Sequence, residues 1–144
     1  MKRLPTWGQR LVTFAEAQVG QPTVWGTNDC HALVRGACEA LYGVDLYADV
    51  PRWRSKGEAL ARLARGEDAV ATLLARGATR LPSPQHAVLG DLLVEPGLPR
   101  TAVRPVWIVV GTLHLGAAAD QRVVAYRRPP DVYPDGTVAV RLPE

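Results

Sequence analysis

The stretch Trp25-Gly26-Thr27-Asn28-Asp29-Cys30 decides the fold, because it ends at the start of a helix. Asp29 is a preferred N-cap residue and directly precedes a run with helical periodicity, and Gly43 supplies the C-cap. The apolar stripe of this helix consists of Leu33, Val34, Ala37, Cys38 and Leu41. Cys30 then lies in the first turn, where unpaired amides and the helix dipole favour a reactive thiolate. A small buried residue is the alternative interpretation of Cys30.

Other helical patterns surround this stretch in the first half of the chain. The expected helices are Trp7 to Val19 with Thr6 as its cap, Ser55 to Gly66 with Ser55 and Glu58 at capping-box spacing, and Ala69 to Ala75 with Asp68 as its cap. Between them, Val44 to Arg54 has no regular period. We expect this irregular segment to be a connection.

Beyond the proline-bounded loop at Leu81 to Gln85, extended patterns replace helical ones. The predicted strands are Asp91 to Val94, Val103 to Val110, Leu113 to Ala117, Val123 to Tyr126 and Thr137 to Arg141. Asp135-Gly136 indicates a hairpin before the last strand. This order of elements, helices followed by an antiparallel sheet, predicts an α+β fold. We expect residues 1–144 to form it as a single domain.

Composition excludes several classes of protein. The chain is 47% hydrophobic, but no apolar run approaches the ~20 residues that cross a bilayer, so we expect no membrane insertion. The first residues lack a secretory h-region, so we expect synthesis in a host cytoplasm without a signal peptide. Arginines are scattered among acids rather than clustered, which argues against nucleic-acid binding. Cys30 and Cys38 match no metal-ligand spacing, so we expect reduced thiols, no metal and no cofactor.

The motifs Trp25-Gly26-x-x-Asp29-Cys30 and Gly90-Asp91-Leu92-Leu93 resemble those of the NlpC/P60 superfamily of papain-like cysteine hydrolases. The order of helices, arginine-rich middle and Gly-Asp strand is most similar to the tail-assembly proteins of long-tailed phages. The resemblance extends from about Trp7 to Tyr126. It implies an antiparallel core facing the helices, with Cys30 in the nucleophile position.

The sequence departs from the active pattern at the strand that should begin with the catalytic histidine. With the terminal glycine of that pattern on Gly111, Pro105 falls on the histidine, and proline cannot act as a base. A Gly111-Thr112 turn would pair Val110 with Leu113 and Val109 with His114, and would leave His114 roughly 13 Å along the strands from position 105, at ~3.3 Å per residue. His114 and the loop residue His86 are the candidate substitute bases. His31 adjoins Cys30, but neighbouring helical residues point apart, so we expect it to face solvent or the cap.

We therefore expect a structural or assembly protein of a phage-type tail tip, with an impaired hydrolase site and a place in the virion tail. Its partners would be other tail proteins of the tip or hub, and peptidoglycan is a further candidate ligand. Trp53, in the irregular segment, is the expected exposed anchor for a protein partner, whereas Trp25 and Trp107 should pack in the core. The alternatives are an active peptidoglycan endopeptidase or amidase that uses Cys30, and a cellular amide or thioester hydrolase.

Overall fold

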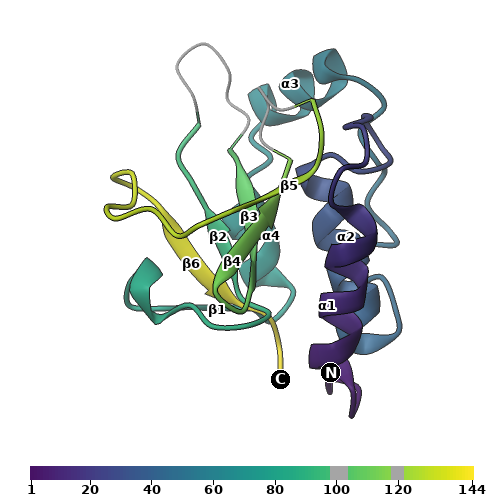
Figure 1. The fold of residues 1–144 in the computed structure, drawn as a ribbon. Coiled ribbons are helices and arrows are strands. Elements are labelled where there is room, and N and C mark those ends of the chain that lie inside the picture. Colours follow the sequence, from purple (N-terminus) through teal and green to yellow (C-terminus); the bar gives the residue numbers. More distant parts are fainter. Residues whose placement is uncertain (98–103, 118–121) are drawn as a thin grey trace.

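The computed structural model describes residues 1–97, 104–117 and 122–144. Its α-helices precede its sheet along the chain, as the sequence predicts (Figure 1). The helices are α1 (Trp7–Gln18), α2 (Cys30–Tyr42), α3 (Lys56–Ala64), α4 (Ala69–Ala75) and the short 3-10 helix η1 (Pro84–His86). The strands are β1 (Thr79–Arg80), β2 (Leu92–Val94), β3 (Val106–Val110), β4 (Leu113–Gly116), β5 (Ala125–Arg127) and β6 (Val138–Arg141).

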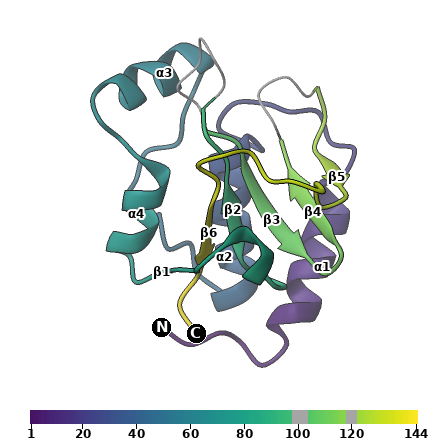
Figure 2. The ribbon, with the colours of Figure 1, turned by 90° about the vertical axis from the view of Figure 1, so that its left-hand side faces the viewer.

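The described strands form one antiparallel sheet in the order β1-β6-β2-β3-β4-β5. The predicted α+β class is therefore confirmed. Helices α1 and α2 stand together beside the sheet, and the two ends of the chain lie close to each other (Figure 1). In the turned view α4 packs beside β6, with α3 above it (Figure 2). The segment between α2 and β1 thus forms a separate flank of the molecule.

The two faces of the sheet bury different residues, because side chains alternate along each strand. The face toward the helices carries Leu92, Val94, Val106, Ile108, Val110, Leu115, Val138 and Val140, which join the main core with Leu33, Ala37 and Cys38 of α2. The opposite face, called the far face below, carries a smaller cluster of Leu93, Trp107, Val109 and Ala139. Leu81, Ala87 and Tyr133, all from loops, pack against that cluster.

Local capping residues explain where the helices begin. Asp29 accepts a hydrogen bond from Ala32 N at 2.8 Å, Ser55 from Glu58 N at 3.1 Å and Asp68 from Val70 N at 3.0 Å. Gly43 ends α2 with a φ of 78°, a left-handed conformation that favours glycine. Thr6 is the exception, because its side chain makes no capping hydrogen bond. The short edge strand β1 was not predicted, and the predicted start of β3 at Val103 lies outside the described residues.

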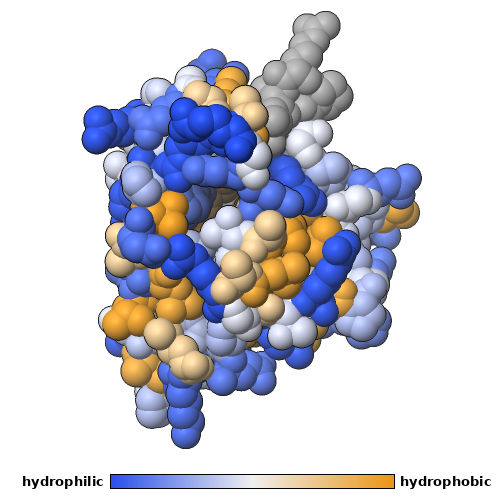
Figure 3. Space-filling model, turned by 180° about the vertical axis from the view of Figure 1, so that it is seen from behind, coloured by the Kyte–Doolittle hydropathy of each residue, from blue (hydrophilic) through white to orange (hydrophobic). Residues whose placement is uncertain are grey.

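The molecular surface is mixed in character. Seen from behind, hydrophilic side chains cover much of the surface and apolar patches lie between them (Figure 3). Among the residues that the structure describes, no helix is both long enough and apolar enough to span a membrane.

Candidate functional site

The connector before α2 is held by its own side chains. Asn28 Oδ1 accepts from Val24 N at 2.6 Å, and Asn28 Nδ2 donates to Pro22 O at 2.5 Å. The second oxygen of Asp29 accepts from Gly26 N at 2.5 Å while the first caps the helix. Asn28 and Asp29 are both buried, so these bonds fix the direction in which the chain enters α2. The position of Cys30 is therefore set locally.

Cys30 is the first residue of α2, as predicted, but its thiol is enclosed. The residue is 6% exposed, and burial raises the pKa of the thiol to about 12, with the nearby Asp29 carboxylate adding to the rise. Hydrogen bonds from the backbone of His31, of Cys30 itself and of Val106 act in the opposite direction. Desolvation of the thiol thus outweighs the stabilisation of a thiolate by the backbone amides at the start of α2. Cys30 is therefore a neutral thiol near pH 7.

Cys30 borders a cavity of about 470 Å³ between the start of α2, the irregular segment, the α3–α4 flank and the start of β3. Its polar and charged lining residues are Cys30, His31, Tyr47, Arg62, Glu67, Asp68, Thr72, Arg76 and Arg104. Its apolar lining residues are Val34, Val50, Trp53, Leu63, Ala69, Leu73 and Val106. This volume lies within the range of ~300–1,000 Å³ that is usual for ligand sites.

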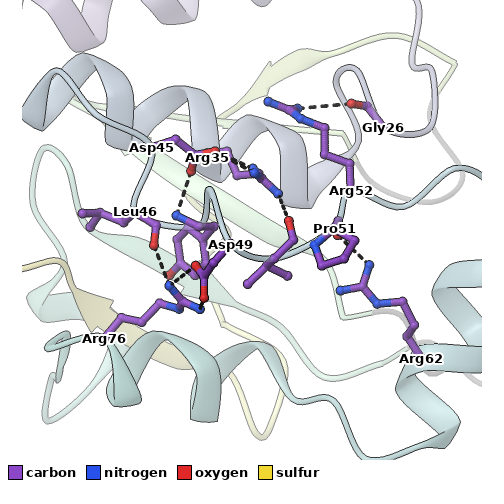
Figure 4. Close-up of polar contacts among 11 residues, drawn as sticks. Gly26, Arg35, Asp45, Leu46, Asp49, Pro51, Arg52, Arg62 and Arg76 are labelled. Atoms are coloured by element: carbon purple, nitrogen blue, oxygen red, sulfur yellow. Dashed lines mark hydrogen bonds and ion pairs between the residues drawn. The ribbon is translucent and has the colours of Figure 1, made fainter.

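Arginines of α2 and α3 and one that follows α4 fix the wall that the irregular segment contributes (Figure 4). Arg35 of α2 pairs with Asp45 at 2.7 Å and donates to Val50 O at 2.6 Å. Arg62 of α3 donates to Pro51 O at 2.7 Å. Arg76, just after α4, binds Leu46 O and the carboxylate of Asp49. The arginine-rich middle of the sequence therefore has a structural role, since its guanidinium groups satisfy the carbonyls of a segment that lacks regular structure.

This wall buries Trp53, which the sequence placed in solvent, and half-buries His31, which was expected to face solvent or the cap. Trp53 is 9% exposed, and its ring lies 5.0 Å from that of His31 and 6.1 Å from that of Trp25. The prediction that Trp53 is exposed is therefore wrong, and its role as an anchor for a partner stays a prediction. His31 is half-buried against Trp53 and Tyr47 and lines the cavity, and burial lowers its pKa. Gly26 permits this packing, because a Cβ there would meet Trp53 O at 2.6 Å.

The two candidate bases lie on the other side of the sheet from Cys30. His114 pairs with Val109 across β3 and β4, so it shares the far face and stacks on Tyr133. His86 is exposed at the end of η1, where it contacts Ser83 Oγ at 2.6 Å, and the next residue, Ala87, packs on the far-face cluster. Neither histidine lines the cavity. The structure does not bring either of them together with Cys30, and their catalytic roles remain untested predictions.

The strand residue that faces Cys30 differs by one position from the expected one. Val110 pairs with Leu113 and Val109 with His114, as predicted for the turn. Arg104 and Val106 line the cavity, whereas Pro105, between them, does not. Because a shift of one residue moves a side chain to the other face, Val106 rather than Pro105 occupies the place opposite the thiol. Neither residue offers a proton acceptor there.

Polar groups of the far face contact one another instead, although Arg127 Nη2 is buried without a hydrogen-bond partner among the described residues. Trp107 Nε1 donates to Glu95 at 2.8 Å, and Arg127 pairs with the same carboxylate at 3.0 Å. The Arg127 guanidinium also lies 3.9 Å from the centre of the Trp107 ring and reaches His114 Nδ1 at 3.4 Å. Burial, followed by the charge of Arg127, lowers the pKa of His114 to about 4. His114 is thus a neutral member of a packed cluster.

These features define an α+β protein with the NlpC/P60 fold. The chain is similar to NlpC2 from Trichomonas vaginalis (TM-score 0.57, 16% identity, 94% of this chain and 46% of that one). It is similar to the peptidoglycan hydrolase RipB from Mycobacterium tuberculosis (TM-score 0.56, 20% identity, 96% and 66%). It is also similar to RipD from the same organism, described as a non-catalytic NlpC/p60 domain protein adapted to peptidoglycan binding (TM-score 0.51, 16% identity, 97% and 100%).

The chain belongs to the DUF6950 family, a domain of unknown function, whose model matches residues 2–129. No curated protein matches it. It spans about half the length of NlpC2 and about two thirds of RipB. At these identities the structural likeness establishes the fold alone.

Proposed function

We propose that this chain is a non-hydrolytic NlpC/P60-like protein that serves as a structural or assembly component of a phage-type tail tip. The observation that carries the first part is the state of Cys30. Its thiol is enclosed, its pKa is raised to about 12, and among the described residues His31, which adjoins it, is the one histidine that lines the cavity. Acyl transfer needs a thiolate and a positioned proton acceptor, and this cavity favours neither.

Binding without cleavage is consistent with one of the structural neighbours. RipD is described as a non-catalytic protein adapted to peptidoglycan binding, while RipB is a peptidoglycan hydrolase. The fold is therefore found with and without catalysis. Peptidoglycan peptides are a candidate ligand for this chain by analogy with these proteins.

The tail role rests on the sequence resemblance. The Trp25-Gly26-x-x-Asp29-Cys30 step, the arginine-rich middle and the Gly90-Asp91 strand start occur in the order seen in phage tail-assembly proteins. In the structure, the arginines of that middle region hold the cavity wall in place.

Two measurements test the proposal. Purified chain is incubated with peptidoglycan, and soluble muropeptides are separated by chromatography. We expect no more release from the natural chain than from Cys30→Ala, because the thiol does not act as a nucleophile. Release that disappears in Cys30→Ala would establish the rival, an active endopeptidase or amidase.

The second measurement addresses assembly in a phage or prophage that encodes this chain. Removal of the gene should prevent formation of infectious tails, and a copy carrying Cys30→Ala should restore them fully. Electron microscopy and plaque counts measure both. Normal tails without the gene would refute the assembly role, and failure of Cys30→Ala to restore infectivity would refute the non-hydrolytic role.

A further inference from the structure

We infer that residues 45–53 of the irregular segment, called the latch below, move away from the start of α2 when His31 is protonated. The movement would open the cavity and expose Cys30 in mildly acidic solution. It goes beyond the proposed function and does not restore an enzyme, because acid keeps the thiol neutral. The contacts of the His31 ring, the charges around it and the hydrogen bonds that hold the latch carry the inference.

The ring of His31 lies where the latch meets α2. It is 5.0 Å from the ring of Trp53, at an interplanar angle of 32°, and 6.0 Å from that of Tyr47, edge to face. Both aromatic residues belong to the latch, are buried and line the cavity together with His31 and Cys30. Two rings of the latch thus pack on an imidazole that is one residue from the thiol.

The latch also contacts the connector that leads into α2. A Cβ at Gly26 would lie 2.6 Å from Trp53 O, so the backbone of the latch lies against that glycine. Arg52 donates to Gly26 O at 3.2 Å (Figure 4), and the rings of Trp25 and Trp53 are 6.1 Å apart. Cys30 follows this connector and is 6% exposed. Movement of the latch away from the connector and His31 would therefore widen the access to the thiol.

The surroundings of His31 disfavour a proton on its ring. Burial is the largest influence and lowers the pKa of the imidazole. Asp29 and Glu67 act in the opposite direction. Arg35, one turn further along α2, and Arg62 of α3 act in the same direction as burial. The neutral imidazole is therefore the form that fits the closed latch.

The carboxylates near His31 are engaged by other groups. Asp29 accepts hydrogen bonds from the amides of Gly26 and Ala32, and Glu67 pairs with Arg62 at 2.9 Å. Among the described residues, neither carboxylate is hydrogen-bonded to His31. The nearby thiol and phenol are neutral near pH 7, because burial raises the pKa of both Cys30 and Tyr47. The other charged residues of the lining belong to the ion pairs Asp68–Arg104, at 3.6 Å, and Asp49–Arg76, at 2.9 Å.

The two arginines that oppose the proton on His31 also hold the latch. Arg35 donates to Val50 O at 2.6 Å and Arg62 to Pro51 O at 2.7 Å (Figure 4), and both arginines are buried. A proton on His31 would add a third positive charge beside these guanidinium groups, where water screens charges weakly. Withdrawal of the latch would relieve this repulsion and hydrate the imidazolium.

The direction of the pH effect follows from the lowered pKa of His31. An open form exposes the ring to water and gives it a pKa near the ordinary value of 6.5, so the open form binds the proton more readily than the closed form. The contribution of neutral His31 to the closed form is fully present above about pH 6.5 and is lost as the pH falls below it. Acid therefore shifts the population toward the open form.

The test measures the access of a small reagent to Cys30 in the full chain carrying Cys38→Ala. A dipyridyl disulfide is suitable because it still reacts with thiols in mild acid, and the unfolded protein at each pH gives the reference rate. We expect the ratio of the folded to the unfolded rate to rise at least about threefold between about pH 7.5 and about pH 5.5. A constant ratio would overturn the inference.

Matched variants assign the effect to one histidine. His31→Gln should abolish the rise, because glutamine is polar but does not take up a proton. His86→Gln and His114→Gln are the controls, since neither histidine lines the cavity, and both should keep the rise. Circular dichroism at the lower pH verifies that each variant is folded. A rise that persists in His31→Gln, or that disappears in His114→Gln, would show that His31 does not control the latch.

Hydrogen exchange followed by mass spectrometry gives a second reading that needs no variant. After correction for the intrinsic pH dependence of exchange, the amides of residues 45–53 should lose protection at the lower pH while those of β2 and β3 keep theirs. Equal loss of protection in both regions would indicate general loosening of the fold and would contradict a local latch.

Discussion

The two faces of the sheet enclose different polar groups. On the far face, Trp107, Glu95, Arg127 and His114 contact one another in a packed network, although Arg127 Nη2 is buried without a hydrogen-bond partner among the described residues. On the helix face, the thiol of Cys30 and the half-buried imidazole of His31 border a cavity. A packed polar network contributes stability, whereas side chains that line a cavity are accessible to a ligand. The comparison therefore associates stability with one face and the proposed binding with the other.

The largest effect should come from the far face. Trp107→Ala removes a buried ring and leaves Glu95 and Arg127 without their aromatic neighbour, so we expect a loss of about 3–5 kcal/mol in the free energy of unfolding. Urea unfolding followed by circular dichroism measures it. Trp107→Phe, which keeps a smaller aromatic ring but removes the Nε1 bond to Glu95, should cost less. A loss below about 1 kcal/mol for Trp107→Ala would contradict the structural role of this face.

The next effect concerns the cavity wall. Arg35→Ala leaves the carboxylate of Asp45 and the carbonyl of Val50 without their donor, and we expect a loss of about 3 kcal/mol because a buried ion pair is broken on one side. The loosened wall should also let a small alkylating reagent reach Cys30 faster. Arg52→Ala is the matched control, since its hydrogen bond to Gly26 O is exposed and long at 3.2 Å. Similar results for both variants would show that Arg35 does not hold the wall.

A smaller effect should appear in the pH dependence of stability. The pKa of His114 is lowered to about 4, below its unfolded value near 6.5, so the unfolded chain binds the proton more readily. Stability contributed by neutral His114 is present above about pH 6.5 and is lost as the pH falls toward 4. His114→Gln should flatten this part of the profile, whereas His86→Gln should leave it unchanged. An unchanged profile in His114→Gln would show that His114 is accessible to water.

Much of the fold was predictable because its signals are local. Asp29, Ser55 and Asp68 each cap the helix that directly follows them, and Gly111 lies at the turn that sets the pairing of β3 with β4. The position of Cys30 at the start of α2 follows from the same local chemistry. The high pKa of its thiol does not follow from local sequence, because the residues that desolvate the thiol come from elements far apart in the chain.

The composition of the cavity was the part that the sequence did not predict. Trp53 is buried and His31 half-buried because arginines of α2 and α3 and one just after α4 converge on residues 45–51, and no local pattern encodes that convergence. The sequence alone also did not show that Arg104 and Val106, rather than Pro105, line the cavity. The arginine-rich middle of the sequence was the one available signal.

The most direct test of the central claim is the pH dependence of Cys30 alkylation in a Cys38→Ala background. With a thiol pKa of about 12, the rate with iodoacetamide should be slow at pH 7 and should rise about tenfold for each pH unit through pH 10. The unfolded protein serves as the fast reference. A rate that levels off near neutral pH would reveal a poised thiolate and contradict the account of Cys30 as an inactive thiol.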